Sequence, residues 1–220
     1  MMPKIIIHNS ISLDGSLTNF EPNMELHYQI AGQYKPDVHL IGSNTIKAGI
    51  DLYEDGVPLE DPSDFKKPTR SKNLPLWVII DSKGQLKGML HTCRRFEFCR
   101  DIIILVSEKT PQVYLQYLRE RNYEYHIVGS DHVDLKKALL LLSKTYNAKT
   151  ILTDTGRILG NLLLNQGLVD EISLLFHPIV VGKKSYNILS NVEKNLDVKL
   201  VKCECLEKQY VWLVYQFNKK

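Results

Sequence analysis

Short apolar runs alternate along the chain with segments in which apolar residues recur at helical spacing. Residues 102–106 are apolar at every position, which is typical of a strand that is covered on both faces. Residues 24–34 instead place Leu26, Ile30 and Ala31 on one stripe, which predicts a helix. Along the sequence these two patterns predict strands at residues 4–11, 38–41, 76–80, 102–106, 123–128, 150–153, 170–181, 198–206 and 210–217. They predict helices at residues 24–34, 44–48, 111–122, 135–146 and 158–165.

The order of these elements predicts the fold class. Repeated strand–helix–strand units imply an α/β protein with a mostly parallel sheet and helices on both faces. The last two strands are joined by a tight turn at Glu207 and Lys208, and they add an antiparallel hairpin at one edge. A chain of 220 residues fits a single domain, which we expect to span residues 1–220. Ligands of such sheets bind beyond the carboxyl ends of the strands, so the segments that follow the strands are the first candidates for a site.

One stretch, residues 51–75, breaks the alternation. It carries Pro58, Pro62, Pro68 and Pro75 among many charged residues. Long irregular segments in compact domains are often functional lids or mobile edges. We therefore expect an irregular excursion of one of these two kinds.

The composition excludes several classes of protein. Hydrophobic residues make up 44% and charged residues 24%, which argues against disorder, collagen and coiled coil as descriptions of the whole chain. The formal net charge is only +3 and the basic residues are scattered, so we expect no nucleic-acid partner. No apolar run has the length of a membrane span or an export signal, which predicts a cytoplasmic protein without a membrane partner. The four cysteines suggest neither a disulfide framework nor a metal site.

Two segments combine a strand before them with a helix after them, and both are suited to bind phosphate. Gly42, Ser43 and Thr45 form the first, in which the backbone of a glycine and two hydroxyl groups precede or open a helix. The second, residues 154–157, contains Gly156 and the positive charge of Arg157. Each could equally be an ordinary helix cap, and neither matches a dinucleotide-binding fingerprint or a P-loop. Two such helix starts in one chain favour an extended ligand such as a dinucleotide.

The other polar residues at strand ends leave their roles open. Asp14 and Gly15 form a turn pair, so Asp14 either shapes a turn or lies at the mouth of a cleft. His8 interrupts an apolar strand, and we favour a place in the core over contact with a ligand. No catalytic triad or pair of glutamates stands out in the sequence. Hydride transfer is therefore an attractive reaction, because the cofactor carries the chemistry and the protein supplies position and electrostatics.

Five motifs follow one another across nearly the whole chain: SLDG at residues 12–15, IGSNT at 41–45, WVIIDS at 77–82, GLVDE at 167–171 and PIVVG at 178–182. Together they resemble the reductase domain of riboflavin-biosynthesis proteins, in its stand-alone form without a deaminase domain. The resemblance implies a three-layer αβα fold like that of dihydrofolate reductase. It also implies NADPH as cofactor, a homodimer, and a ribosylamino-pyrimidine substrate whose ribosyl group is reduced to a ribityl group. The last two strands supply an apolar surface for pairing in Val211, Trp212, Leu213 and Tyr215.

The resemblance also assigns residues, to which the strand-end analysis adds others. Asp154 matches a glutamate of the family that touches the substrate, and we expect Asp14 or Asp154 to supply a proton. Lys83 could pair with the 2′-phosphate of NADPH. The candidate cofactor-binding residues are Ser10, Gly42, Ser43, Thr45, Ser82, Lys83, Thr155, Gly156, Arg157, Ile158 and Leu159.

Some positions depart from the family pattern. Gln33 stands where the family has an arginine for the substrate phosphate, Gly49 replaces an aspartate, and one glycine of a glycine run survives at Gly156. Gln33 carries no charge, so another cation would have to bind the phosphate, with Lys35, Lys47 and Arg70 as the candidates. Two alternatives therefore stay open: a reductase of another heterocycle or carbonyl, and a non-catalytic nucleotide-binding dimer.

Overall fold

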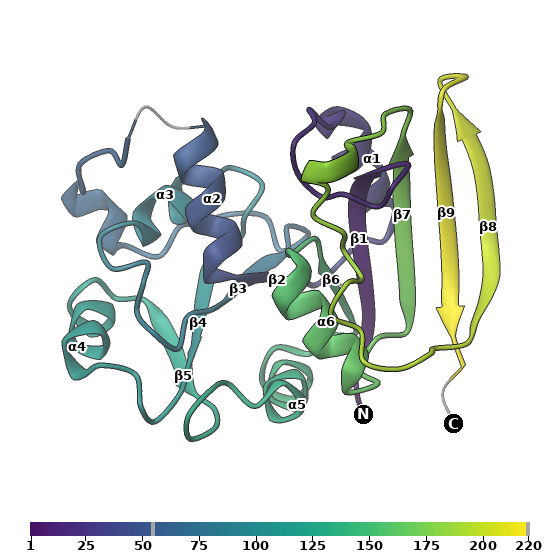
Figure 1. The fold of residues 1–220 in the computed structure, drawn as a ribbon. Helices are drawn as coiled ribbons and strands as arrows, with labels where there is room; N and C mark the ends of the chain where they lie inside the picture. Colours follow the sequence, from purple (N-terminus) through teal and green to yellow (C-terminus); the bar gives the residue numbers. More distant parts are fainter. Residues whose placement is uncertain (54–55, 219–220) are drawn as a thin grey trace. The chain divides into compact units, whose positions relative to one another are not determined.

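The computed structural model describes residues 1–53 and 56–218, and the chain forms two compact units (Figure 1). The middle unit consists of residues 1–3 and 36–149. The terminal unit consists of residues 4–35 and 150–220, so it is built from both ends of the sequence. The expectation that the chain forms a single domain stays a prediction.

The middle unit contains four parallel strands in the order β5-β4-β3-β2. Their bounds are Val38–Gly42 for β2, Leu76–Ile80 for β3, Ile102–Val106 for β4 and Glu124–Ile127 for β5. Its helices are α2 (Ser43–Tyr53), α3 (Leu90–Arg95), α4 (Gln112–Glu120) and α5 (Leu135–Tyr146). All five residues of β4 are buried, as its uninterrupted apolar sequence predicts. Asp134 caps α5 by accepting a hydrogen bond from the Lys137 backbone N–H, which also confirms the predicted start of that helix.

The terminal unit contains five strands in the order β6-β1-β7-β9-β8. Strands β1 (Lys4–Ser12), β6 (Thr150–Thr153) and β7 (Glu171–His177) are parallel. Strands β8 (Val198–Leu206) and β9 (Tyr210–Phe217) form the predicted antiparallel hairpin beside β7. Its turn places Glu207 and Lys208 at φ angles of 48° and 63°, the left-handed conformation that a tight hairpin turn needs at both central positions. These strands lie side by side in Figure 1.

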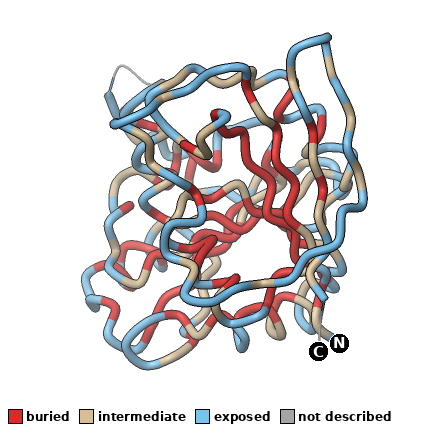
Figure 2. Tube along the Cα trace, turned by 45° about the vertical axis from the view of Figure 1, so that its right-hand side comes forward, coloured by how far each residue is buried: buried red, intermediate tan, exposed pale blue. Residues whose placement is uncertain are grey.

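Two helices cover opposite faces of the terminal unit's strands. Helix α1 (Met24–Gln33) packs Leu26 and Ile30 against Leu175 of β7 and Trp212 of β9. Helix α6 (Arg157–Asn165) lies on the other face, where Gly160 faces Ile7 of β1. Figure 2 shows continuous buried stretches through the interior, and β1 and β4 are buried at all or nearly all positions, whereas β8 is mostly exposed. Fold class, parallel strands and closing hairpin are therefore confirmed.

Three elements differ from the sequence prediction. Helix α3 was not predicted, and α2 continues to Tyr53 rather than ending near residue 48. Strand β7 ends at His177 instead of residue 181, because Pro178 has no N–H for a ladder and the Ile179 N–H turns back to the His177 carbonyl.

The excursion at residues 51–75 is anchored over much of its length, while residues 54 and 55 lie outside the described part. Its first three residues belong to α2, and a short 3₁₀ helix spans Pro62–Phe65. Glu60 binds Arg121 beyond the end of α4, and Asp64 binds Arg95 of α3 through both carboxylate oxygens. Arg70 donates to the backbone carbonyls of residues 95, 96 and 99. From Pro58 to Arg70 the excursion is therefore held against α3 and the end of α4, which argues against a lid.

Candidate active site

The carboxyl half of β1 places polar side chains in the interior of the terminal unit. His8, Asn9, Ser10 and Ser12 follow three buried isoleucines and are themselves buried. Because side chains alternate along a strand, His8, Ser10 and Ser12 point to the face that α1 covers, and Asn9 points to the face of α6. Buried polar groups need hydrogen-bond partners, so the partners of these residues indicate what each can do.

His8 belongs to a chain of hydrogen bonds that fixes its tautomer. Trp212 Nε1 donates to Ser173 Oγ at 2.9 Å, and Ser173 Oγ lies 2.9 Å from His8 Nδ1. His8 Nε2 lies 3.2 Å from the backbone carbonyl of His27, which can only accept, so Nε2 carries the proton and Nδ1 accepts from Ser173. Burial lowers the pKa of His8 to about 3, and the neighbouring His27 ring adds to the effect. His8 is thus a neutral core histidine, as the sequence favoured.

His27 of α1 lies between Ser10 and Asp154. Its Nδ1 is 3.1 Å from Ser10 Oγ, and its Nε2 is 3.8 Å from a carboxylate oxygen of Asp154. The His27 side chain is 5% exposed and the Asp154 side chain 16%, so the carboxylate is the more accessible end of this row. The His8 and His27 rings lie against each other at a tilt of 31°, with centroids 4.4 Å apart. The row Ser10–His27–Asp154 therefore joins β1, α1 and the end of β6.

Asn9 fixes the backbone at Asp154 and keeps one acceptor unused. Asn9 Nδ2 donates to the backbone carbonyl of Asp154 at 2.9 Å. Asn9 Oδ1 is buried and has no hydrogen-bond partner among the described residues. A buried acceptor without a partner costs about 1–3 kcal/mol, so this atom is suited to receive an N–H group of a ligand.

Asp14 is occupied by the loop that follows β7. It accepts hydrogen bonds from Ser12 Oγ at 2.6 Å and from the backbone N–H groups of Val181 at 3.1 Å and Gly182 at 2.9 Å. The Ser12 bond and the two backbone bonds lower the pKa of Asp14 to about 2. Such a carboxylate holds its proton too weakly to donate it near neutral pH, and its contacts are those of a loop anchor.

The start of α6 presents backbone N–H groups without a side-chain cap. Gly156 is the N-cap residue with φ −67° and ψ 179°, so the residue at the cap position has no side chain with which to cap the helix. The Arg157 guanidinium lies over the Tyr186 ring at 3.9 Å and donates to Ser190 Oγ at 3.0 Å. Ile158 is exposed and Leu159 is buried. An uncapped helix start beside a guanidinium is a suitable site for a phosphate group.

The remaining candidates lie in the middle unit, at the ends of β2 and β3. Gly42 ends β2, Ser43 opens α2 and is buried, and Thr45 lies in the first turn of α2. Ser82 and Lys83 follow β3 in a turn that the Asp81 carboxylate closes by accepting from the backbone N–H groups of residues 85 and 86. The Ser82 carbonyl accepts from Thr110 Oγ1 at 2.8 Å, while Lys83 is exposed. Within the middle unit, each group follows the carboxyl end of a parallel strand, as predicted.

His27 and Ser173 are the two residues of the terminal unit's polar network that the sequence analysis missed. Ser173 lies in an apolar strand and reads as an ordinary strand residue. His27 does carry a signal, since it adjoins Leu26 and precedes Ile30 by three, which places it at the edge of the buried stripe of α1. A histidine at such a position is a candidate for a buried polar contact.

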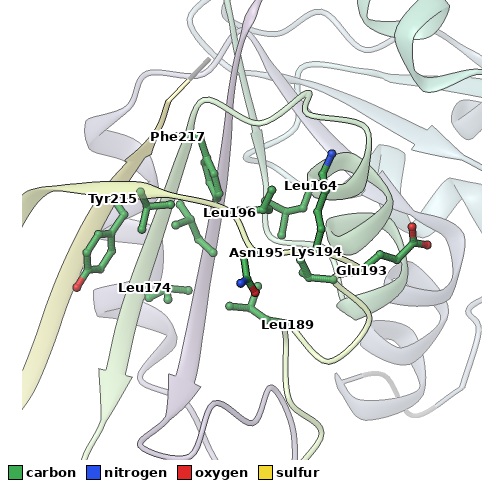
Figure 3. A pocket seen from close by; sticks show the side chains of 12 residues that line it. Leu164, Leu174, Leu189, Glu193, Lys194, Asn195, Leu196, Tyr215 and Phe217 are labelled. Atoms are coloured by element: carbon green, nitrogen blue, oxygen red, sulfur yellow. The ribbon is translucent and has the colours of Figure 1, made fainter. Parts of the chain in front are cut away.

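A separate apolar pocket of about 520 Å³ opens on the α6 face of β7 and β9 (Figure 3). Leu164 of α6, Leu174 of β7, Tyr215 and Phe217 of β9 and the segment 192–196 line it, together with Ile172, Leu189 and Val198. None of the predicted site residues belongs to it. We expected Trp212 to belong to the apolar pairing surface of the last two strands. It does not, because it is only 4% exposed and packs against α1.

The residues that the structure describes show neither a metal cluster nor a membrane-spanning helix. No group of three or more histidine, cysteine, aspartate or glutamate residues there could hold a metal ion. Within the same residues, no helix has the length and apolar character that crossing a bilayer requires. All four cysteines are free thiols, and burial raises the pKa of both Cys93 and Cys99 to about 12.

A sequence model of the RibD C-terminal domain matches residues 3–212. The chain belongs to the RibD C-terminal domain family. Among curated proteins, it is 25% identical over 191 residues to a 2,5-diamino-6-ribosylamino-4(3H)-pyrimidinone 5′-phosphate reductase of Aquifex aeolicus, covering 82% of this chain and 79% of that one. It is 25% identical over 210 residues to the protein of the same name from Methanothermobacter thermautotrophicus, with 88% and 86% covered.

Solved structures of related name share the fold. A pyrimidine reductase-like protein from Corynebacterium diphtheriae matches 99% of this chain and 93% of its own at 15% identity, with a TM-score of 0.75. The riboflavin biosynthesis reductase of Saccharomyces cerevisiae matches 99% of this chain and 90% of its own at 16% identity, with a TM-score of 0.68. The predicted resemblance and fold class are thus confirmed.

Proposed function

We propose that this protein is an NADPH-dependent reductase that converts the ribosylamino group of 2,5-diamino-6-ribosylamino-4(3H)-pyrimidinone 5′-phosphate to the ribityl form. The observation that carries this proposal is the match of the family over residues 3–212, together with relatives that bear this reductase name over more than four fifths of the chain. The reaction belongs to riboflavin biosynthesis, and we place it in the cytoplasm.

The geometry of the terminal unit fits a nicotinamide dinucleotide. The start of α6, from Thr155 to Leu159, would hold the pyrophosphate on its backbone N–H groups, with Arg157 adding positive charge. Asn9 Oδ1, which has no partner among the described residues, would accept an N–H group of a bound ligand. Ser10 would act at one remove, because its hydroxyl contacts His27.

We propose that NADPH is preferred over NADH, and the residues that support this proposal lie in the middle unit. NADPH carries a 2′-phosphate that NADH lacks. Lys83 is exposed in the turn after β3 and offers a charge, while Ser82 offers a hydroxyl group. Gly42, Ser43 and Thr45 remain the proposed cofactor contacts at the end of β2.

When bound, the cofactor supplies the hydride, and the protein must supply a proton to the sugar. Of the two aspartates predicted to do so, we propose Asp154. Its carboxylate is partly exposed and faces His27, whereas Asp14 accepts three hydrogen bonds and has a pKa of about 2. Asn9 holds the Asp154 backbone in place through its hydrogen bond to the carbonyl. Asp14 instead holds the loop at Val181 and Gly182.

The candidate cations for the substrate phosphate differ in the contacts that they already make. Gln33 and Lys35 are exposed at the end of α1, and Arg70 is engaged with three backbone carbonyls. Lys47 is exposed on α2. We propose Lys47 over Arg70, since moving Arg70 would leave those carbonyls without their donor.

The function is tested by mixing the purified protein with NADPH and the phosphorylated substrate and following the loss of NADPH absorbance. Turnover with NADPH, and slower turnover with NADH, is the expected result. A folded protein that binds NADPH but reduces no ribosylamino-pyrimidine would contradict the substrate. A protein whose tryptophan fluorescence is not quenched by added NADPH would contradict the cofactor.

We also propose that the protein is a homodimer that pairs through the β8–β9 hairpin. Val198 and Leu200 of β8 and Val211 of β9 are 41%, 49% and 36% exposed, and β8 is the edge strand of the terminal unit. Exposed apolar side chains on an edge strand are a common docking surface. A second copy of this chain is the occupant that the family resemblance implies.

A further inference from the structure

We propose that His27 and Asp154 form one proton-delivering pair, in which His27 is a positioning residue that acts through Asp154 on the sugar of the substrate. The proposal rests on the proposed reductase function and extends it to a residue on α1. The juxtaposition that carries it is the row Ser10 Oγ, His27 Nδ1, His27 Nε2 and Asp154 Oδ2, with separations of 3.1 Å at one end and 3.8 Å at the other.

Only one of the two stacked imidazoles can change its protonation state without losing a partner. His8 Nε2 faces a backbone carbonyl and must keep its proton, while its Nδ1 receives the Ser173 hydroxyl. A second proton on His8 would lie at a fully buried nitrogen, against the charge of His27. His8 therefore stays neutral and serves as a rigid stacking partner.

His27 has partners that suit both of its protonation states. A hydroxyl group can donate or accept, so Ser10 donates to Nδ1 of the neutral ring and accepts from Nδ1 of the charged ring. A carboxylate at Nε2 favours a proton on that nitrogen in either state. Ser10 thus allows His27 to take up and release a proton while the ring stays in place.

The groups around His27 are known from every element packed against it. Strand β1 contributes His8 and Ser10, the end of β6 contributes Asp154, and β7 contributes His177, whose pKa is lowered mainly by burial and slightly by His27. Tyr28, the next residue of α1, meets the His27 ring edge-on at 5.1 Å. Asp154 is the carboxylate that the structure places at the His27 ring, with 3.8 Å between His27 Nε2 and Asp154 Oδ2.

The chemistry of the sugar requires the proton that this pair would deliver. The C1′–O4′ bond breaks with its electron pair going to O4′, which takes the proton from Asp154, while the exocyclic nitrogen forms a double bond to C1′. The hydride then adds to C1′ and restores the amine. The sum is substrate, NADPH and one proton giving the ribityl product and NADP⁺. Asp154, the more exposed of the two groups, regains its proton from solvent while His27 holds its carboxylate in position.

The main test compares the wild-type protein with His27→Gln. We expect His27→Gln to lower kcat at pH 7.5 by about 100-fold, the usual scale of general acid catalysis, with NADPH binding by fluorescence quenching unchanged within about two-fold. In both proteins kcat should decline as the pH is raised and the acid loses its proton. We expect the midpoint of this decline to lie at least about one pH unit lower in the variant, because a carboxyl group without the His27 partner loses its proton near pH 4. His132→Gln, at an exposed histidine of the middle unit, is the matched control and should change neither quantity.

Asp154→Asn makes the test specific to the pair. Residues that act as one unit have non-additive effects, so His27→Gln with Asp154→Asn should be no slower than Asp154→Asn alone. Two independent losses that multiply would overturn the proposal, as would a His27→Gln protein that keeps the wild-type kcat and pH profile. Far-UV circular dichroism and NADPH binding identify a variant that has failed to fold.

A second measurement needs neither substrate nor turnover. Imidazole ¹⁵N chemical shifts report which ring nitrogen carries the proton. In the wild-type protein we expect the Nε2–H tautomer for both His8 and neutral His27. In the Asp154→Asn variant, His8 should keep this tautomer and His27 should no longer prefer it. An unchanged His27 tautomer would overturn the pairing. A wild-type protein with the expected tautomers but no turnover would overturn the proposed function and the catalytic role, so the two failures are distinguishable.

Discussion

Single residues of this protein take their roles from the group that each of their atoms faces. Two histidines stack on each other, yet one faces a backbone carbonyl and a serine of β7, and the other faces a serine of β1 and a carboxylate. The same kind of side chain is a fixed core element in the first case and, in our proposal, a positioning residue for Asp154 in the second.

The first prediction concerns the pH dependence of stability at His8. Its pKa is lowered to about 3 in the folded protein, while an unfolded histidine has a pKa near 6.5. The unfolded chain therefore binds more protons below pH 6.5, and the free energy of unfolding falls as the pH is lowered through the window from 6.5 to 3. Above pH 6.5 this contribution to stability is fully present.

His8→Gln should reduce by one the number of extra protons that the unfolded chain binds below pH 6.5. We expect the slope of the free energy of unfolding between pH 6.5 and 5 to decrease by about 1.4 kcal/mol per pH unit, as measured by urea unfolding. His132→Gln is the exposed control and should leave the slope unchanged. A His8→Gln protein with the wild-type slope would show that His8 is not buried in neutral form.

The sequence predicts part of the site at the residue scale. The burial of His8 follows from its place among isoleucines, and the strand-end rule singles out Asp154. The role of His27 could not be predicted, because it depends on β1, α1 and the end of β6 meeting in space. The anchoring of Asp14 depends in the same way on Val181 and Gly182, which lie far from it in sequence.

At the scale of elements, α6 connects the fold to the proposed cofactor. Gly156→Val should weaken NADPH binding at least about ten-fold, which corresponds to 1.4 kcal/mol, because a branched side chain would occupy the space beside the helix's first N–H groups. The backbone at Gly156, with φ −67° and ψ 179°, accepts any residue, so the variant should fold. Fluorescence quenching measures the affinity.

Gly32→Val is the control for that experiment. Gly32 lies in the last turns of α1, where an added Cβ meets no atom within 4 Å. It should bind NADPH like the wild-type protein. Equal affinity of a folded Gly156→Val protein would place the pyrophosphate elsewhere.

A third prediction concerns the contact between the 3₁₀ helix and α3. The Arg95 guanidinium holds the pKa of Asp64 below its usual range, so this carboxylate stabilises the fold above its unfolded pKa of about 3.9 and loses that effect as the pH falls. Asp64→Asn should lower the free energy of unfolding at pH 7 by about 2 kcal/mol, since the buried Asp64 would lose its charge-assisted hydrogen bonds to Arg95, while Arg95, 40% exposed, stays hydrated. Urea unfolding measures it.

Asp131→Asn provides the comparison. Asp131 pairs with Lys109 at the surface, where both side chains are more than half exposed. Such pairs contribute at most about 1 kcal/mol, so this variant should unfold nearly like the wild-type protein. Equal losses in both variants would show that the Asp64 contact is no stronger than a surface pair.

Elements with strong patterns were predicted almost to the residue, and the others were not. Strands β3, β4, β6, β8 and β9 match their predicted bounds because each is a clear apolar or alternating run between turn residues. Helix α3 was missed because its buried face includes Arg94, which is paired with Asp101. From sequence alone, an arginine is assigned to the exposed face of a helix, because the partner that allows its burial is known only from the structure.

At the scale of the whole molecule, the proposed homodimer depends on the apolar surface of the β8–β9 hairpin. The α6 face of the hairpin carries Leu200 and Val211, and the 520 Å³ apolar pocket continues that face toward β7. A stable dimer buries about 1,200–2,000 Å² in total, and an obligate one is centred on apolar side chains. The hairpin is the part of the terminal unit that offers such a surface on an edge strand.

The last prediction is that Leu200→Glu converts a dimer into a monomer. A charge in the centre of an apolar interface has no partner and is costly to desolvate, so light scattering at micromolar concentration should show the mass falling from twice the chain mass to 25.3 kDa. Val113→Glu is the matched control, since Val113 on α4 is 58% exposed and lies in the middle unit. If both variants stay dimeric, the pairing surface is not this hairpin, and if the wild-type protein is already a monomer, the homodimer proposal is wrong.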